Sequence, residues 1–267
     1  MSNSWRAFML TAIGVMLAFR TTEGQNAAPT RPARTGYLTA GQMTDVTSIV
    51  LPAPSTGDPR FAADMAIYRA TRALEGTPRW EMAISDDNVS TNGILSAFSC
   101  PLGVTAENAE RLRAVIAKAN VDTLRPALAL KKLYQHKRPF QVEAGKVCLS
   151  DRGRAALETD PDYPSGHTTA SWEAGLILAE LAPDAAQAIL ARARAFGESR
   201  IVCGVHNASA VEARRMTATA VFAAQQSSPE FRADIEAARE ELAALRAKSE
   251  RPARCTDEAA LVATRVF

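Results

Sequence analysis

The stretch that decides the fold reads GHTTASWEAGLILAELAPDAAQAILARARAF and spans residues 166–196. Apolar residues recur at helical spacing on both sides of Pro183. We therefore expect one helix over residues 167–181. A second helix is expected over residues 183–196, because proline fits the first turn of a helix but not its interior.

The helical pattern continues on both sides of this stretch. Asp58 and Pro59 have the residue types of an N-cap and a first helical position, and Thr105 has that of another N-cap. Pro126 is expected in the first turn of a separate helix that begins at Asp122. The further expected helices span residues 59–74, 77–85, 106–119, 122–134, 205–226 and 229–248. Because convincing strands are few, the chain is predicted to be all-α.

Two segments lack the helical pattern. Residues 139–164 form a long irregular stretch, and loops of that length are usually functional or disordered. Residues 25–57 are polar and proline-containing at first and end in LPAPSTGDP, so they are expected to be an extended N-terminal arm. The length of 267 residues then leaves residues 58–267 for a single all-α domain.

The first residues have the features of an export signal. Arg6 precedes an uncharged, mostly apolar run over residues 7–19, and Arg20 closes it. Because this run is short for a transmembrane helix, residues 1–24 are predicted to be a signal peptide. An uncleaved membrane anchor is the alternative. No later stretch is apolar enough to span a bilayer, so no stable membrane insertion is expected after signal removal.

The cysteines indicate two disulfides, as an even number in an exported chain usually does. They are Cys100, Cys148, Cys203 and Cys255, and their wide spacing without C-x-x-C argues against a zinc site. Three pairings are open, of which Cys203 with Cys255 and Cys100 with Cys148 is one. Buried free thiols are the alternative.

The net charge of +2 is too near neutral to indicate a nucleic-acid partner, so any attraction for anions must come from local clusters. One cluster is KKLYQHKRPF at residues 131–140. Its Lys131 and Arg138 could neutralise a transferring phosphoryl group. A solvated basic face is the usual alternative, and it is the interpretation for Lys132 and Lys137. His136 is expected at the surface or in a loop, without a role.

Two further motifs contain the other histidines. In YPSGHTT, residues 163–169, the helix start offers free N–H groups to an anion, Gly166 allows close approach, and His167 can donate a proton. In ESRIVCGVHNASA, residues 198–210, the fork of Arg200 suits phosphate oxygens, and neutral His206 can attack phosphorus. A capped helix with a surface His167, and a buried structural His206 with a surface Arg200, are the alternatives.

The motifs occur in the order K-x6-R-P, P-S-G-H and S-R-x5-H. This order resembles the type 2 phosphatidic acid phosphatase superfamily, and above all the bacterial class A non-specific acid phosphatases. The likeness extends over residues 36–215. It includes GYLTAGQMTDVTSIVLPAPSTGD and FAADMAIYRATRALEGTPRW, which are similar to the arm and first helices of that group.

The resemblance implies a compact helical bundle of the type 2 phosphatidic acid phosphatase and vanadium haloperoxidase kind, a periplasmic location, and no cofactor or metal. The implied partners are small-molecule phosphate monoesters, and a homo-oligomer is possible. His206 would be the nucleophile that forms a phosphohistidine, and His167 would protonate the leaving alcohol. The residues implied to bind the phosphate oxygens are Lys131, Arg138, Ser165, Gly166 and Arg200.

The sequence departs from the family pattern at one position. The pattern continues S-R-x5-H-x3-D, with an aspartate that orients the nucleophile, but the residue here is Ala210. In serine proteases, loss of the orienting carboxylate costs about 10⁴ in rate. We expect Ser209, Asn207 or a backbone carbonyl to hold the ring instead, because Glu212 points to another helix face.

Three functions follow from these motifs. A metal-independent acid phosphatase with a bell-shaped pH profile is predicted first, since every other cation and histidine of the pattern is present. A catalytically weak or inactive phosphate-compound binding protein is the alternative that Ala210 supports. A vanadium-dependent haloperoxidase-like enzyme is another alternative, because vanadate mimics phosphate.

Overall fold

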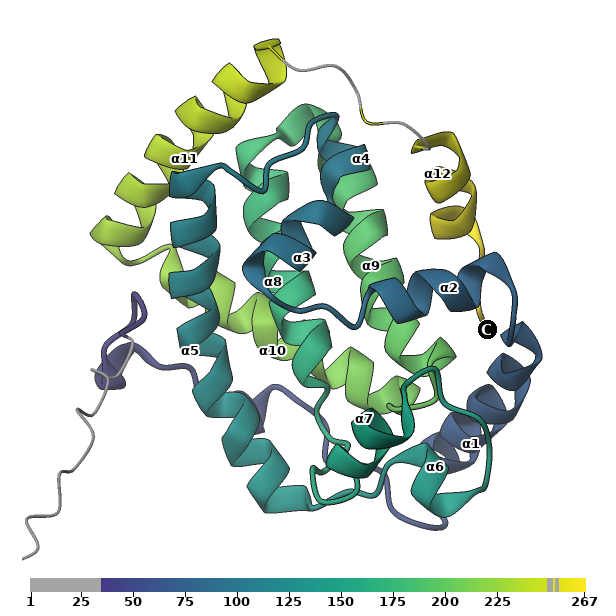
Figure 1. Cartoon of the computed structure of the whole chain (residues 1–267). Helices are drawn as coiled ribbons and strands as arrows, with labels where there is room; N and C mark the ends of the chain where they lie inside the picture. Colours follow the sequence, from purple (N-terminus) through teal and green to yellow (C-terminus); the bar gives the residue numbers. More distant parts are fainter. Residues whose placement is uncertain (1–34, 249–251, 253–254) are drawn as a thin grey trace, which may run out of the picture. The chain divides into compact units, whose positions relative to one another are not determined.

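The computed structural model describes residues 35–248, 252 and 255–267 (Figure 1). The predicted signal peptide, and residues 25–34 of the predicted arm, lie outside these residues. The described part of the chain contains helices and no strands, which confirms the all-α prediction. The α-helices are α1 (Pro59–Thr71), α2 (Pro78–Ser85), α3 (Thr91–Ala97), α4 (Ser99–Leu102), α5 (Glu110–Tyr134), α6 (Pro139–Val142), α7 (Asp151–Ala156), α8 (Gly166–Leu181), α9 (Ala186–Val202), α10 (Ala208–Gln225), α11 (Pro229–Lys248) and α12 (Cys255–Ala263). Short 3₁₀ turns cover Ala40–Gln42, Val46–Ser48, Arg72–Leu74 and Pro183–Ala185.

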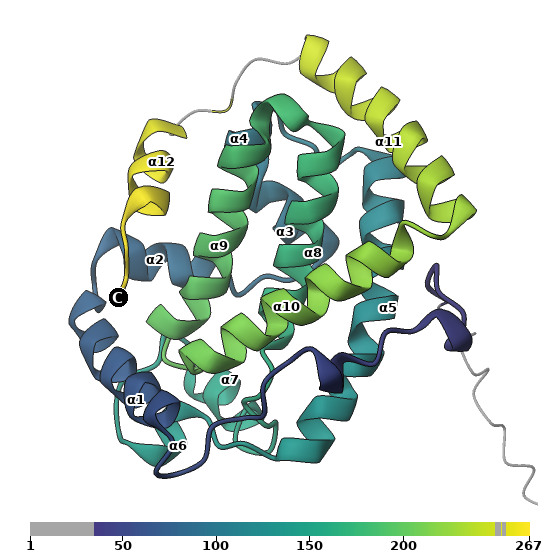
Figure 2. The same ribbon diagram turned by 180° about the vertical axis from the view of Figure 1, so that it is seen from behind.

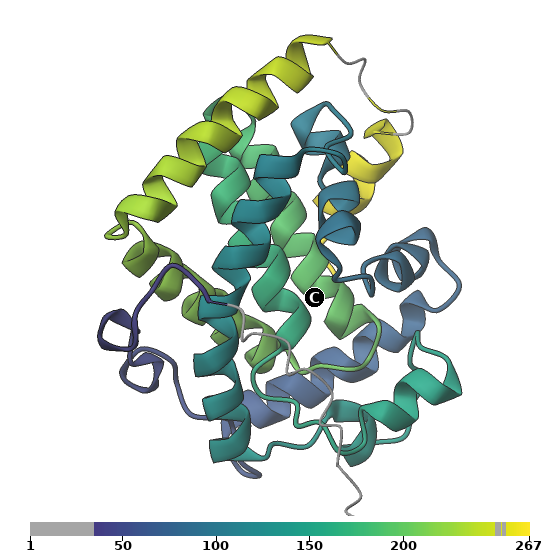
Figure 3. The same cartoon turned by 60° about the vertical axis from the view of Figure 1, so that its left-hand side comes forward.

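Residues 166–196 form α8 and most of α9, and these two helices lie side by side at the centre of the bundle. Gly175 permits this approach, because a Cβ there would lie 2.6 Å from the Cβ of Ala193. Seen from behind, α10 crosses α8, α9 and α5 (Figure 2). The ends of α5 and α9 and the starts of α8 and α10 therefore meet at one end of the bundle, where α6 and α7 also lie (Figure 3).

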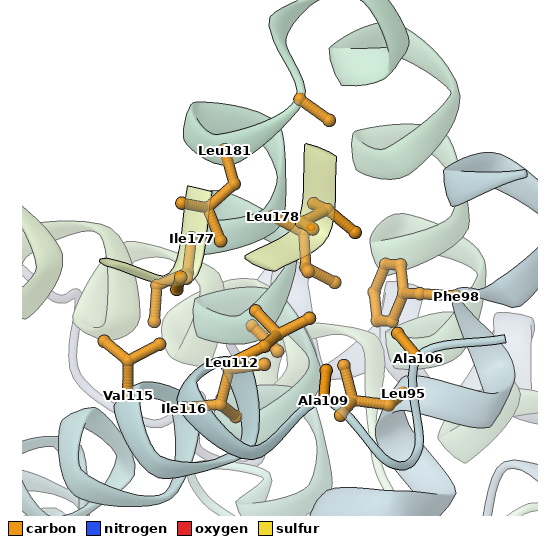
Figure 4. Packing of buried hydrophobic residues seen from close by; sticks show 14 of the residues in the cluster. Leu95, Phe98, Ala106, Ala109, Leu112, Val115, Ile116, Ile177, Leu178 and Leu181 are labelled. Carbon is orange, nitrogen blue, oxygen red and sulfur yellow. The ribbon is translucent and has the colours of Figure 1, made fainter. Parts of the chain in front are cut away.

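The largest apolar cluster packs between α3, α5, α8 and α11 (Figure 4). Phe98, Leu112, Ile177 and Leu178 are each 0% exposed within it. Burying one such side chain contributes about 1.5–3 kcal/mol. This cluster fixes α5 against α8, and so sets the relative positions of the helix ends that carry the polar motifs.

The prediction of two helices over residues 106–134 is wrong. A single helix, α5, runs from Glu110 to Tyr134 with Pro126 inside it, and its N-cap is Ala109 rather than Thr105. An internal proline costs about 3 kcal/mol or more. We attribute the continuous helix to its packing against α8, α10 and α11, which buries Pro126 among other residues of its inner face.

Other boundaries also differ from the prediction. Residues 139–164 are largely irregular as expected, but they contain the short helices α6 and α7. Helix α9 continues past Phe196 to Val202, and α10 begins at Ala208, after a turn in which Gly204 has a φ of +78°. No side chain would adopt this conformation easily. A Cβ at Gly204 would also lie 2.5 Å from Nη1 of Arg72.

Two disulfides form, as the cysteine count predicts, but with a pairing that differs from the one suggested. Cys100 pairs with Cys255, and Cys148 pairs with Cys203. The second bond joins the long loop before α8 to the turn after α9, and the backbone N–H of Cys148 also donates to the carbonyl of Cys203 at 3.0 Å. Spacing alone cannot distinguish the pairings, because these contacts depend on tertiary structure.

The described part of the N-terminal arm is fixed to the bundle by polar contacts. The carboxylate of Asp122 on α5 accepts hydrogen bonds from the N–H groups of Tyr37 (2.9 Å) and Leu38 (3.3 Å). Further along, the carbonyl of Leu51 accepts a hydrogen bond of 2.5 Å from the hydroxyl of Tyr163. Within the described residues, no helix is both long and apolar enough for a bilayer crossing.

Candidate active site

The predicted site residues come together where α5, α8, α9 and α10 meet. Val205 and His206 both donate their N–H groups to the carbonyl of Arg200, at 3.2 Å each, so the turn after α9 folds back on that arginine. Nη1 of Arg138 lies 3.1 Å from Nε2 of His206. Ser165 donates its N–H to the carbonyl of Ala210 at 3.1 Å, which joins the start of α8 to the start of α10.

His206 is held at both ring nitrogens, by Asp162 at Nδ1 and by Nη1 of Arg138 at Nε2. Its side chain is 2% exposed, and Nδ1 lies 2.8 Å from Oδ1 of Asp162. An ionised carboxylate only accepts, so Nδ1 carries the proton and Nε2 keeps its lone pair. Burial and the charge of Arg138 lower the pKa of His206 to about 3, despite the opposing effect of Asp162. The imidazole is therefore neutral and nucleophilic at mildly acidic pH.

Asp162 supplies the orienting carboxylate that position 210 lacks. It is 0% exposed, and it accepts hydrogen bonds from both His206 and the N–H and side-chain amide of Asn207, the latter two at 3.2 and 2.9 Å. Burial alone would raise the pKa of Asp162, but hydrogen bonds from His136 and His206 outweigh it and hold this pKa far below its ordinary value. Asp162 thus remains ionised.

The expectation that Ser209, Asn207 or a backbone carbonyl holds the ring is wrong. Ser209 instead donates its N–H and hydroxyl to Asp64, at 2.9 and 2.5 Å, and Asn207 binds the orienting carboxylate rather than the ring. Asp162 lies 44 positions before His206 and shares no helix with it. In the sequence, the only indication of this contact is that an aspartate stands three residues before Ser165, in an unusually long loop.

His136 lies in the loop between α5 and α6, one of the two places expected for it, but it was given no role and belongs to the same hydrogen-bond chain. Its side chain is 12% exposed; Nδ1 lies 3.1 Å from Oδ2 of Asp162, and Nε2 lies 2.9 Å from the carbonyl of Pro54 in the arm. Burial lowers the pKa of His136, but the hydrogen bond and charge of Asp162 raise it by more, so the net shift is upward. The arm therefore fixes His136, which contacts the carboxylate that holds His206.

Two of the predicted phosphate-binding cations lie on the His206 side of the site. Lys131 and Arg138 are bridged by Oδ2 of Asp160, at 2.8 and 2.5 Å, and Asp160 is 45% exposed. The guanidinium of Arg138 is 1% exposed and also donates to the carbonyl of Val205 at 2.7 Å. Burial lowers the pKa of Lys131 more than its contacts with Asp160 raise it. Arg138 is thus fixed beside Nε2 of His206, and Asp160 links Lys131 to it.

Arg200 and His167 form the other side of the site. Both contact one carboxylate, because Oδ1 of Asp87 lies 2.7 Å from Nη1 of Arg200 and 3.2 Å from Nε2 of His167. The His167 side chain is 25% exposed, whereas that of Arg200 is 1% exposed. Burial and the charge of Arg200 lower the pKa of His167, although Asp87 opposes the shift. His167 is thus the more accessible of the two predicted catalytic histidines.

The start of α8 provides an anion-binding position of the expected kind. Ser165 is the N-cap, and its hydroxyl accepts hydrogen bonds from the N–H of Thr168 at 3.4 Å and from its hydroxyl at 3.0 Å. Gly166, the first residue of the helix, is exposed, and a Cβ there would meet no described atom within 4 Å. The first turn of this sixteen-residue helix therefore keeps N–H groups without an intrahelical partner, beside a residue with no side chain in the way.

The site lies in the part of the chain that is similar to known proteins. Residues 112–227 match the PAP2 superfamily model, and this span contains all seven predicted site residues. The chain is 36% identical over 203 residues to an acid phosphatase of Zymomonas mobilis, covering 75% of this chain and 76% of the relative. It is 32% identical over 213 residues to a non-specific acid phosphatase of Providencia stuartii, covering 79% of this chain and 86% of the relative. A non-specific acid phosphatase of Salmonella typhi is 33% identical over 210 residues, covering 75% of this chain and 82% of the relative.

The chain belongs to the acid phosphatases of the PAP2 superfamily. The activity that follows is hydrolysis of phosphoric monoesters, which confirms the predicted enzyme class. Within this acid phosphatase, the departure at position 210 coincides with a carboxylate at position 162 that makes the contact expected from the missing one. Ala210 is 0% exposed and packs in a cluster with Tyr163, so it has become part of the apolar support behind the site.

Proposed function

We propose that this acid phosphatase acts through a phosphohistidine on Nε2 of His206. The observation that carries the proposal is the hydrogen bond of 2.8 Å between Nδ1 of His206 and Asp162, because it puts the proton on Nδ1 and the lone pair on Nε2, which faces the phosphate-binding candidate Arg138. That lone pair attacks phosphorus, the bond from phosphorus to the ester oxygen breaks, and the released oxygen takes a proton from His167. Water then attacks phosphorus and gives a proton to His167, and inorganic phosphate leaves with His206 neutral again.

The charged and polar groups of the site can stabilise the charge that develops in this reaction. Lys131, Arg138 and Arg200 offer three cations to the oxygens of a phosphate dianion, and Ser165 and the N–H of Gly166 offer neutral donors. We infer that a bound metal ion is not required, since these groups can stabilise the charge of the transferring phosphoryl group by themselves.

Asp162 favours turnover over the phosphate-binding alternative. The main support for a binding protein was the missing orienter at position 210, and Asp162 occupies the equivalent place beside Nδ1 of His206. The relatives' names likewise give no support to a haloperoxidase. We further propose that the enzyme works in the periplasm, a location that two disulfides suit because they persist in oxidising compartments.

Hydrolysis of p-nitrophenyl phosphate with EDTA present tests this proposal. We expect turnover in the unmodified enzyme and none above background in His206→Ala. The pH profile should be bell-shaped and acidic, because His206 must be neutral, with a pKa of about 3, and His167 must be protonated, with a pKa below its ordinary value. Turnover that needs an added divalent cation, or that survives in His206→Ala, would overturn the mechanism.

A further inference from the structure

Asp87 lies beside His167, and the residue before it, Asp86, fixes its position. The carboxylate of Asp86 is 1% exposed and accepts hydrogen bonds from Arg192 (2.5 and 3.1 Å) and from the hydroxyl of Ser199 (2.6 Å). These contacts fix the turn after α2 against α9. Asp87 follows at once, and its side chain is 42% exposed where it contacts Arg200.

Asp160 and Asp87 are two half-exposed carboxylates that contact the proposed phosphate-binding cations on different sides of the site. Asp160 contacts Lys131 and Arg138 beside the nucleophile. Asp87 contacts Arg200 and His167, the residue that gives its proton to the leaving oxygen in the proposed reaction. The alcohol part of a substrate must lie on the His167 side, and it therefore lies beside Asp87.

Asp87 can keep its place while a phosphate binds. Only Nη1 of Arg200 is engaged by the carboxylate, and the buried Nε of Arg200 has no hydrogen-bond partner among the described residues. A phosphate oxygen can thus use Arg200 without displacing Asp87. The hydrogen bond from His167 lowers the pKa of Asp87 to about 2, against the opposing effect of burial, so the negative charge persists at acidic pH.

We propose that Asp87 determines specificity, selecting phosphate monoesters whose alcohol part is neutral or cationic near the ester oxygen and disfavouring those whose alcohol part is anionic. This inference rests on the proposed function, since that function places the leaving group at His167. A like charge beside Asp87 repels an anionic alcohol, whereas a cationic alcohol is attracted. Lys131, Arg138 and Arg200 attract the phosphate of every substrate equally and do not distinguish among alcohols.

The test compares kcat/KM for phosphocholine, p-nitrophenyl phosphate and 3-phosphoglycerate in the unmodified enzyme and in Asp87→Asn. We expect the ratio of the 3-phosphoglycerate value to the phosphocholine value to rise about tenfold in Asp87→Asn, and to return toward the original in Asp87→Glu. Asp257→Asn, which removes an exposed charge on α12, should leave the ratio unchanged. An unchanged ratio in an active Asp87→Asn enzyme would overturn this inference and leave the proposed function intact.

A second measurement does not depend on turnover. Calorimetry gives the affinities of 2-aminoethylphosphonate and 3-phosphonopropionate, which carry opposite charges on similar chains. The ratio of these affinities should shift toward the anionic ligand by about tenfold in Asp87→Asn. Equal ratios in the two proteins would overturn the inference even if the variant were inactive. Binding of both ligands by an unmodified enzyme that hydrolyses no ester would instead contradict the proposed function, and with it this role of Asp87.

Discussion

Two carboxylates in this protein are equally buried and have opposite pKa shifts. Asp162 beside the nucleophile and Glu173 in the middle of α8 are both 0% exposed. The pKa of Asp162 is held far below its ordinary value, whereas burial raises the pKa of Glu173 to about 8. Burial alone therefore does not decide the charge of a carboxyl group in this fold.

The difference lies in the donors around each group. Asp162 accepts from two histidine rings and from two N–H groups of Asn207, and the charge of Arg138 also stabilises its anion. Among the described residues, Glu173 accepts hydrogen bonds only from the neutral side chains of Gln225 (3.2 Å) and Thr123 (3.3 Å). Burial and the charge of Asp122 raise its pKa by more than these donors and the charge of Arg214 lower it. The active site is thus built around a stabilised charge, and the bundle core contains a carboxyl group that stays protonated.

Removing the charge at Asp162 should have the largest effect. In Asp162→Asn, the amide can no longer favour the Nδ1–H tautomer or stabilise positive charge on the ring, so we expect kcat to fall by about 10³–10⁴. Steady-state hydrolysis of p-nitrophenyl phosphate measures this. The matched control is Asp151→Asn, an exposed aspartate in the same loop region, which should retain full activity. A kcat within tenfold of the unmodified enzyme would show that Asp162 does not orient the nucleophile.

Removing one donor to Asp162 should have a smaller effect. In His136→Gln the carboxylate loses a cationic partner, and we expect kcat to fall about tenfold, as it does when outer partners of functional histidines are removed. Because Asp162 then attracts a proton onto His206 more strongly, the acidic limb of the pH profile should move upward from about pH 3. An acidic limb that stays in place, with kcat reduced, would indicate a purely structural role for His136.

The protonated carboxyl in the core should affect stability rather than turnover. An unfolded chain loses the Glu173 proton near its ordinary pKa, and the folded protein retains it up to about 8, so stability falls as pH rises between these values. In Glu173→Gln this contribution is removed, and the variant should gain about 3 kcal/mol relative to the unmodified protein between pH 5 and pH 8. Thermal unfolding at both pH values measures this. Parallel changes in Tm for both proteins would contradict the assignment.

The sequence predicted which side chains come together at the candidate site but not the groups that hold them. Lys131, Arg138, Ser165, Arg200 and the two histidines stand in local motifs whose spacing reflects their chemistry. Asp162 contacts His206 across 44 positions and His136 contacts Asp162 across 26, both through tertiary structure, and no helical periodicity links them. The same limit explains the disulfide pairing. It also explains α5, because packing against three helices outweighs the local preference of Pro126.

The central claim is that Asp162 prepares His206 as the nucleophile. The most direct test is to quench the reaction under basic conditions during turnover, digest the protein, and locate the phosphoryl group by mass spectrometry. We predict phosphate on His206 in the unmodified enzyme and about 10³-fold slower labelling in Asp162→Asn. Phosphate on another residue, or full-rate labelling of His206 in Asp162→Asn, would contradict the account.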